Sequence, residues 1–171
     1  MERFDVKRGL VKQITEEGGL ATVAKKYFEV VNDNGNNSFS GSHDIMTSIE
    51  AHFNDSGALI VDVKNIPPNF EDREAMKIAQ DSRKRWTQFL DEVTGYNSKQ
   101  RGDKAKEWAK KSSKAKSAVS QALHFMKVSS NVSEEIKEKA DALISEINSC
   151  LENNDFTKAA SRGEKLNKLF Q

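Results

Sequence analysis

The first half of the chain alternates apolar and polar positions with the two-residue period of β-strands. This alternation predicts an antiparallel sheet, because short strands separated by turn residues pair readily with their sequence neighbours. The clearest strand directs Ile45, Thr47, Ile49, Ala51 and Phe53 to the core and leaves Met46, Ser48, Glu50 and His52 in water. The predicted strands are residues 3–7, 30–31, 38–40, 44–53 and 58–64.

Turn-forming residues stand between these strands. Asn34-Gly35 is the dipeptide best able to occupy two adjacent positive-φ positions, so it predicts a tight hairpin between residues 30–31 and 38–40. The residues from Asn54 to Gly57 predict the turn that joins the two longer strands into a second hairpin.

Apolar residues at helical spacing predict two helices in the same half. Pro67-Pro68 ends the second hairpin because proline donates no backbone N–H, and a long helix to Val93 follows. A sheet covered by two helices is a two-layer sandwich. The helix that starts at Glu16 presents Leu20, Val23, Ala24, Tyr27 and Phe28, and the long helix presents Ala75, Ile78, Ala79, Trp86, Phe89 and Leu90.

A short corner separates this half from a strongly basic helix. Thr94-Gly95 ends the long helix, since glycine takes positive φ without a Cβ clash. Asn97 or Ser98 then caps the next helix, because either side-chain oxygen can accept a hydrogen bond from a free amide of the first turn.

The residues after this corner predict three helices that form an antiparallel bundle. Ser133 is the expected N-cap of the second helix, with Glu134 and Glu135 in its first turn, and the third helix follows the turn at residues 153–155. Alanine and glycine along the apolar stripes permit close packing. The stripes are Ala105, Trp108, Ser112, Ala115, Val119, Ala122 and Met126, then Ile136, Ala140, Leu143, Ile147 and Leu151, and finally Phe156, Ala159, Ala160, Gly163, Leu166 and Phe170.

These patterns predict an α+β protein with two parts. Residues 1–96 form the two-layer α/β sandwich, an antiparallel sheet covered by two helices. Residues 97–171 form a helical extension with a basic first helix, folded as an antiparallel three-helix bundle.

Motifs at the two ends of the first part resemble a known family. Val6-Lys7-Arg8-Gly9 stands at the start, and Phe89-Leu90, Thr94-Gly95-Tyr96, Lys99 and Arg101 stand at the end. Over about residues 1–105 the chain resembles an uncharacterised archaeal family, a small domain of unknown function described as a two-layer α/β sandwich. The resemblance implies that fold, an archaeal source and a shared surface made by Lys7, Arg8, Tyr96, Lys99 and Arg101.

Charge is unevenly distributed along the chain, although the net charge is only +1. Residues 97–128 hold 9 Lys or Arg against 2 Asp or Glu, whereas residues 1–96 hold 12 against 16. Cys150 is the single cysteine and cannot form an internal disulfide, and no stretch approaches the ~20 apolar residues of a membrane span. We therefore expect a cytoplasmic protein that does not associate with membranes.

The basic helix is the main candidate site. Cations along a helix that rises ~1.5 Å per residue can match backbone phosphates, and a segment with a single arginine favours binding with little sequence specificity. A solvated helix face is the alternative interpretation of this charge. The candidate nucleic-acid-binding residues are Lys7, Arg8, Tyr96, Lys99, Arg101, Lys104, Lys106, Lys110, Lys111 and Lys114.

No combination of residues predicts catalysis. His43, His52 and His124 are scattered along the chain, and no cluster has metal-ligand spacing. A nucleophile, a base and oxyanion donors cannot be assembled from the sequence. We therefore expect a non-enzymatic protein without a cofactor or metal.

The sequence narrowly favours association with the backbone of DNA or RNA over binding to a protein. The alternative is a protein-protein interaction or scaffold module. In that case the helical bundle or the exposed sheet face binds another protein or a second copy of the chain.

Overall fold

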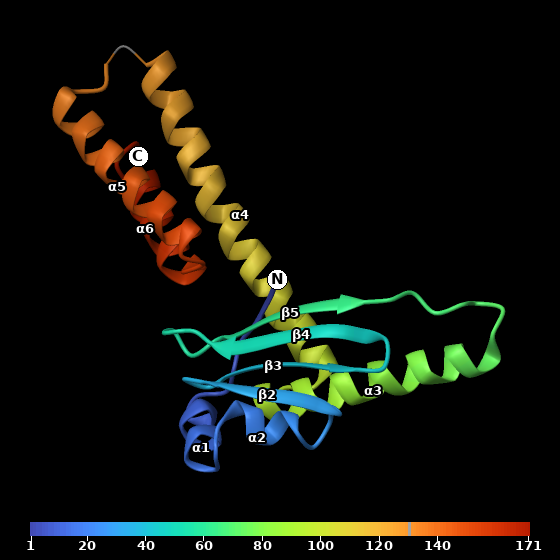
Figure 1. The fold of residues 1–171 in the computed structure, drawn as a ribbon. Helices are drawn as coiled ribbons and strands as arrows, with labels where there is room; N and C mark the ends of the chain where they lie inside the picture. The colour runs from blue at the N-terminus through green and yellow to red at the C-terminus, as the bar shows by residue number, and fades with distance from the viewer. Residues whose placement is uncertain (130) are drawn as a thin grey trace. The chain divides into compact units, whose positions relative to one another are not determined.

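The computed structural model describes residues 1–129 and 131–171, and it confirms the predicted α+β class (Figure 1). The chain divides into two compact units, Met1–Gly102 and Asp103–Gln171. The first contains the sheet and the helices that cover it, and the second is helical. None of the helices in the described residues has the length and apolar character needed to cross a membrane.

A five-stranded antiparallel sheet forms the first layer of unit 1. The strand order is β1-β5-β4-β3-β2, so β1 and β2 lie at opposite edges. The predicted hairpin between the two longest strands is confirmed, with Ala51 opposite Val61. The strands are β1 (Glu2–Phe4), β2 (Val30–Gly35), β3 (Ser38–His43), β4 (Met46–Phe53) and β5 (Leu59–Asn65).

The turn of the β2–β3 hairpin is displaced from its predicted position. Gly35 pairs with Ser38, so the two turn residues are Asn36 and Asn37, both at positive φ, rather than Asn34-Gly35. A bulge between Asp33 and Gly35 accounts for the displacement, because it adds a residue to β2 before the turn. Two asparagines then adopt the left-handed conformation that this residue type tolerates.

A second bulge changes the faces of β4. The prediction placed Thr47 in the core and Met46 in water, but Met46 is 3% exposed and Thr47 is exposed. Pairing with β5 shifts between Met46 and Ser48, so Thr47 is an extra residue that reverses the alternation before it. Ile49 and Ala51, beyond the bulge, are buried as predicted.

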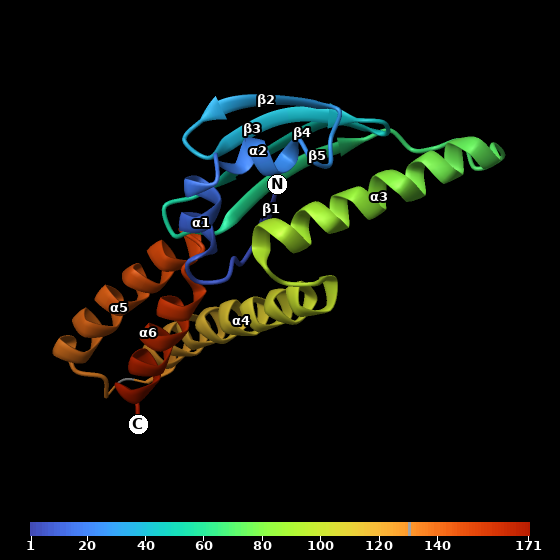
Figure 2. The same ribbon diagram turned by 90° about the horizontal axis from the view of Figure 1, so that it is seen from below.

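Three helices, rather than two, pack on the core face of the sheet (Figures 1 and 2). The helix predicted from Glu16 begins only at Leu20, because Gly18 and Gly19 both have positive φ, and the short helix before these glycines was not predicted. The long third helix has the predicted end at Gly95, and the Asp72 carboxylate caps its start by accepting from the Glu74 and Ala75 amides. The helices are α1 (Leu10–Glu16), α2 (Leu20–Ala24) and α3 (Arg73–Thr94).

Aromatic rings join the helices to the sheet in the core of unit 1. The rings of Phe28 and Phe89 are 5.0 Å apart, and Phe39 of β3 meets Phe89 edge-on at 5.6 Å. These phenylalanines are at most 5% exposed. The core is therefore centred where α2 and α3 meet β3.

Unit 2 is built on three helices, α4 (Ser98–Val128), α5 (Glu134–Glu152) and α6 (Phe156–Lys168), the first of which begins at the end of unit 1. Asn97 is the cap of α4, since its side chain accepts from the Gln100 amide at 2.9 Å. Ser133 caps α5 as predicted. Small residues dominate the core, which contains Ala115, Ala122, Ala140, Ile147, Cys150, Ala159 and Leu166.

Candidate binding surfaces

The predicted binding residues fall into two sets. Unit 1 contains Lys7, Arg8, Tyr96, Lys99 and Arg101, and unit 2 contains the remaining lysines. Arg101 is the most buried of them, at 8% exposed. Its guanidinium forms an ion pair with Asp91 and donates to the Tyr96 carbonyl and to Ser98 Oγ. Arg101 therefore ties the end of α3 to the start of α4, and its donors are directed into the corner.

The rest of the corner is arranged around Gly95. The Lys7 ammonium lies 5.4 Å from the centre of the Tyr96 ring, and the Lys7 amide donates to the Thr94 carbonyl at 3.0 Å. Gly95 has φ 71°, a conformation that favours glycine, and a Cβ there would also lie 2.9 Å from Lys7 Cδ. Arg8 and Lys99 are exposed beside the corner.

Four of the candidate lysines on α4 face carboxylates. Lys104 and Lys111 both approach Glu107, at 3.6 and 3.0 Å, and Lys106 lies 3.7 Å from Asp103. Lys114 reaches Glu164 of α6 at 2.6 Å. Hydrogen bonds from Lys111 and Lys114 lower the pKa values of Glu107 and Glu164, respectively. These pairs reduce the positive field of the helix.

Lys110 and Lys116 complete the basic segment. Both are exposed, and neither has an ion pair within residues 1–129 and 131–171. Lys106 and Lys110 are four residues apart and therefore share one side of α4, whereas Lys104 and Lys111 are half-buried beside the bundle. The lysines surround the helix instead of forming one continuous face.

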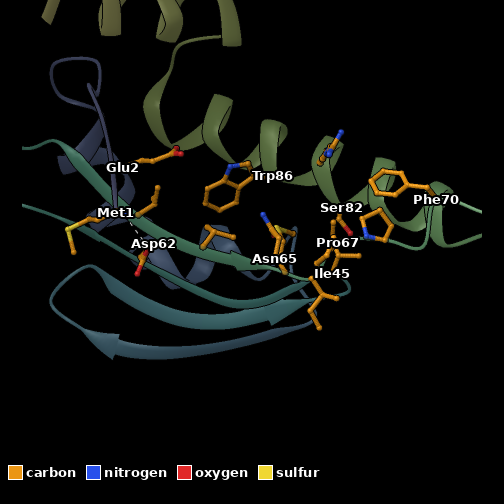
Figure 3. Close-up of a pocket in the computed structure, with 15 residues that line it drawn as sticks. Met1, Glu2, Ile45, Asp62, Asn65, Pro67, Phe70, Ser82 and Trp86 are labelled. Atoms are coloured by element: carbon orange, nitrogen blue, oxygen red, sulfur yellow. Dashed lines mark ion pairs between the residues drawn. The ribbon is translucent and has the colours of Figure 1, made fainter. Parts of the chain in front are cut away.

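A groove of about 330 Å³ lies between β5 and α3 in unit 1 (Figure 3). Trp86 and Ser82 project from α3, and Asn65 lies below them on β5. The remaining wall is largely apolar and includes Met46, Val61, Val63, Pro67 and Pro68. A concave apolar site with a few polar groups is the usual form of a binding pocket.

Exposed apolar side chains border one end of this groove. Phe70 is 77% exposed and Ile66 is 58% exposed, and both line the groove from the segment between β5 and α3. Arg83 of α3 is an exposed cation on the same wall, and it has no ion pair in the described part of the chain. Neighbouring apolar groups in water indicate an interaction surface.

The groove borders an open stretch of sheet edge. β1 pairs only with Leu59, Ile60 and Val61, so among the described residues β5 has no strand beside it from Asp62 onward, apart from β4. Asp62 itself lies 3.2 Å from the amino group of Met1. An unpaired strand edge next to an apolar groove can accept a further polypeptide segment.

Ser82, Asp44 and His43 lie close together near the groove. Asp44 Oδ2 is 3.5 Å from Ser82 Oγ and 3.3 Å from His43 Nε2, and neither ring nitrogen of His43 has hydrogen-bond geometry to a partner in the described residues. The Ser82 hydroxyl donates to the Ile78 carbonyl at 3.0 Å. A nucleophile needs a base within hydrogen-bond reach, and here the carboxylate stands between the hydroxyl and the imidazole.

Sequence reasoning missed the groove. Trp86 packs against the core as expected, and its half-buried ring also lines the groove. One available signal was the pair Ile66 and Phe70, which flank Pro67, Pro68 and Asn69 in a segment where a turn needs no apolar side chains. The open edge of β5 depends on the strand order, and local periodicity does not contain that information.

The fold and the surfaces define an α+β protein with a grooved sheet unit and a basic helical unit. Residues 1–107 match a domain of unknown function, DUF5611, so the chain belongs to that family. The match includes the sheet, α1–α3 and the start of α4. Neither a curated protein nor a solved structure matches the chain.

Proposed function

We propose that this chain is a non-enzymatic binding protein that receives a segment of another protein in the groove of unit 1. The observation that carries the proposal is the exposure of Phe70 and Ile66 beside an apolar groove. Leaving two large apolar side chains in water forgoes about 1.5–3 kcal/mol each, which burial against a partner would recover.

Two further features support a polypeptide partner. Arg101 is engaged in the corner and four of the six candidate lysines on α4 face carboxylates, so a smaller cationic surface is available for phosphates than the composition suggests. The groove instead combines apolar walls with polar groups from Asn65, Ser82 and Arg83, as interfaces with peptide segments do.

A peptide-display selection tests the proposal. Random peptides of about ten residues are selected on the intact chain, and the enriched peptides are then titrated against the variant Ile66→Ser/Phe70→Ser. We expect the double variant to bind them at least about tenfold more weakly, because both anchors at the rim are lost. Both positions are exposed, so the substitutions leave the core unchanged.

The matched control is Val30→Ser. Val30 is 49% exposed and lies on β2, at the opposite edge of the sheet. This variant should bind the selected peptides like the unaltered chain. Equal binding by all three proteins, or no enrichment in the selection, would contradict a peptide site in the groove.

A second proposal is weak binding of nucleic-acid backbone by α4, favoured by Lys110 and Lys116, which are exposed and have no ion pair among the described residues. Changing Lys106, Lys110 and Lys116 to Gln should reduce the log–log salt slope of duplex DNA binding by about 3, from roughly 0.9 per phosphate contact. Single-stranded RNA is titrated in parallel. An unchanged slope, or no binding at low salt, would contradict this second proposal and mean that the lysines of α4 only form a solvated surface.

A further inference from the structure

We propose that the partner segment binds as an extended strand beside the free part of β5, with apolar side chains in the groove and an acidic side chain near Arg83. This inference rests on the proposed function and adds the binding mode and the chemistry of the peptide. It concerns residues Val63 to Asn65, which follow the part of β5 that β1 covers.

Hydrogen bonding on the β4 side shows which main-chain groups face the free edge. The Ile66 amide donates to the Ile45 carbonyl, and the Lys64 carbonyl accepts from Thr47 Oγ1. The main-chain N–H and C=O groups of Lys64 and Ile66 are therefore directed toward β4. Main-chain groups alternate in direction along an antiparallel strand. The N–H and C=O groups of Val63 and Asn65 are therefore directed toward the free edge.

The same residues present their side chains to the groove. Val63 and Asn65 both line it, together with Val61 and Asp62, whereas Lys64 does not. Alternate side chains of an added strand would continue this face and pack against Trp86 and Phe70. The site thus offers main-chain and apolar contacts to the same segment, the two requirements of binding by strand addition.

The other edge of the sheet lacks these features. β2 ends in the polar residues Asn32 to Gly35 and contains a bulge, and bulges and polar side chains both oppose edge pairing. The described surface therefore favours the β5 edge as the docking site.

Direction and charge define the expected peptide. A segment running antiparallel to β5, like every strand pair in this sheet, begins near Asn65 and ends near Val63, before the position of Met1 beside Asp62. Arg83 follows Ser82 on α3, which Figure 3 places near Asn65. An acidic residue in the first half of the peptide therefore complements the unpaired guanidinium.

The test uses a capped peptide of about seven residues in which valine alternates with threonine and glutamate is the first residue. Binding is followed by the fluorescence of Trp86 in a Trp108→Phe background. N-methylation of two alternate amides that face β5 should weaken binding about tenfold per amide, because each removes a donor to the strand. N-methylation of the intervening amides is the matched control and should change binding much less.

Three outcomes discriminate between the proposals. Loss of binding with only one of the two methylation patterns supports strand addition. Replacing the peptide's glutamate by glutamine should also weaken binding less in the variant Arg83→Gln than in the unaltered chain. Equal sensitivity to both patterns overturns strand addition, but leaves the groove as a peptide site if the Ile66→Ser/Phe70→Ser variant still loses binding. Absence of binding by the unmethylated peptide overturns this inference, and the display selection then decides the proposed function separately.

Discussion

At the scale of single residues, Arg101 has a structural role that its place in a basic segment does not indicate. It was predicted to bind phosphate because it lies in a basic segment, yet its side chain is 7% exposed and pairs with Asp91. A guanidinium has several donors, and here they hold together the residues that end one helix and begin the next. The sequence gives the charge of a side chain but not the direction in which that side chain points.

Arg101→Gln should therefore destabilise unit 1. We expect a loss of about 2 kcal/mol in the free energy of unfolding, less than for a fully buried pair because the Asp91 side chain is 43% exposed. Urea unfolding followed by Trp86 in the Trp108→Phe background measures it. Lys99→Gln, at an exposed position two residues earlier, should change stability by less than about 0.5 kcal/mol. Similar effects of the two substitutions would contradict the structural role of Arg101.

Tyr27 and Glu92 form a second cluster whose effect depends on pH. Burial of the phenol and its hydrogen bond to Glu92 raise the pKa of Tyr27 to about 12. Burial opposes ionisation of Glu92, but the hydrogen bonds from Lys26 and Tyr27 outweigh it and lower the pKa of that carboxyl. These groups join the residues that follow α2 to α3, and the Tyr27 ring also packs edge-on against Phe89 at 6.1 Å.

The raised pKa of Tyr27 predicts a specific alkaline loss of stability. The unfolded chain ionises near the ordinary value of 10 and the folded chain only near about 12, so the folded state retains the proton in this window and loses stability as pH rises through it. Urea unfolding measures the free energy of unfolding of the unaltered chain and of Tyr27→Phe. The difference between the two free energies should decline as the pH rises between these two values. A difference that stays constant with pH would contradict the prediction.

At the scale of elements, periodicity predicted most of the strands and helices. It was less successful wherever the backbone departs from a regular repeat. The bulges in β2 and β4 each insert a residue, so one moved the hairpin turn and the other moved Met46 into the core. Gly18 and Gly19 moved the start of the helix predicted from Glu16 to Leu20. Such local irregularities are stabilised by tertiary packing, which a single sequence does not display.

Close packing of α6 on α4 gives the prediction for the bundle. A Cβ at Gly163 would lie 3.1 Å from the Ala118 Cβ, so a larger side chain must separate the two helices. Gly163→Leu should destabilise unit 2 by about 1–3 kcal/mol through overpacking. Ser161→Leu introduces the same side chain at an exposed position of α6 and should cost much less.

Urea unfolding followed by Trp108 in a Trp86→Phe background measures both bundle variants. Trp108 reports on this unit because its ring packs edge-on against Phe156 at 5.2 Å. If Gly163→Leu were as stable as Ser161→Leu, the small-residue contact between α4 and α6 would not be a determinant of the fold.

At the scale of the whole molecule, the α+β class and the position of the basic segment could be predicted from the sequence, but the groove could not. Fold class follows from local patterns, whereas the groove requires β5 to lie near one edge of the sheet with α3 across it. The binding proposals therefore differ in origin. Nucleic-acid binding was suggested by composition, and peptide binding by the arrangement of β5, α3 and the segment between them.

The most direct test of peptide binding is amide hydrogen exchange at Val63 and Asn65, measured by NMR with and without the alternating peptide. In the free chain these two amides should exchange much faster than that of Val61, which lies opposite Glu2 of β1. Saturating peptide should slow both. If both amides are already as protected as that of Val61, or stay unprotected when the peptide is bound, β5 does not accept an added strand.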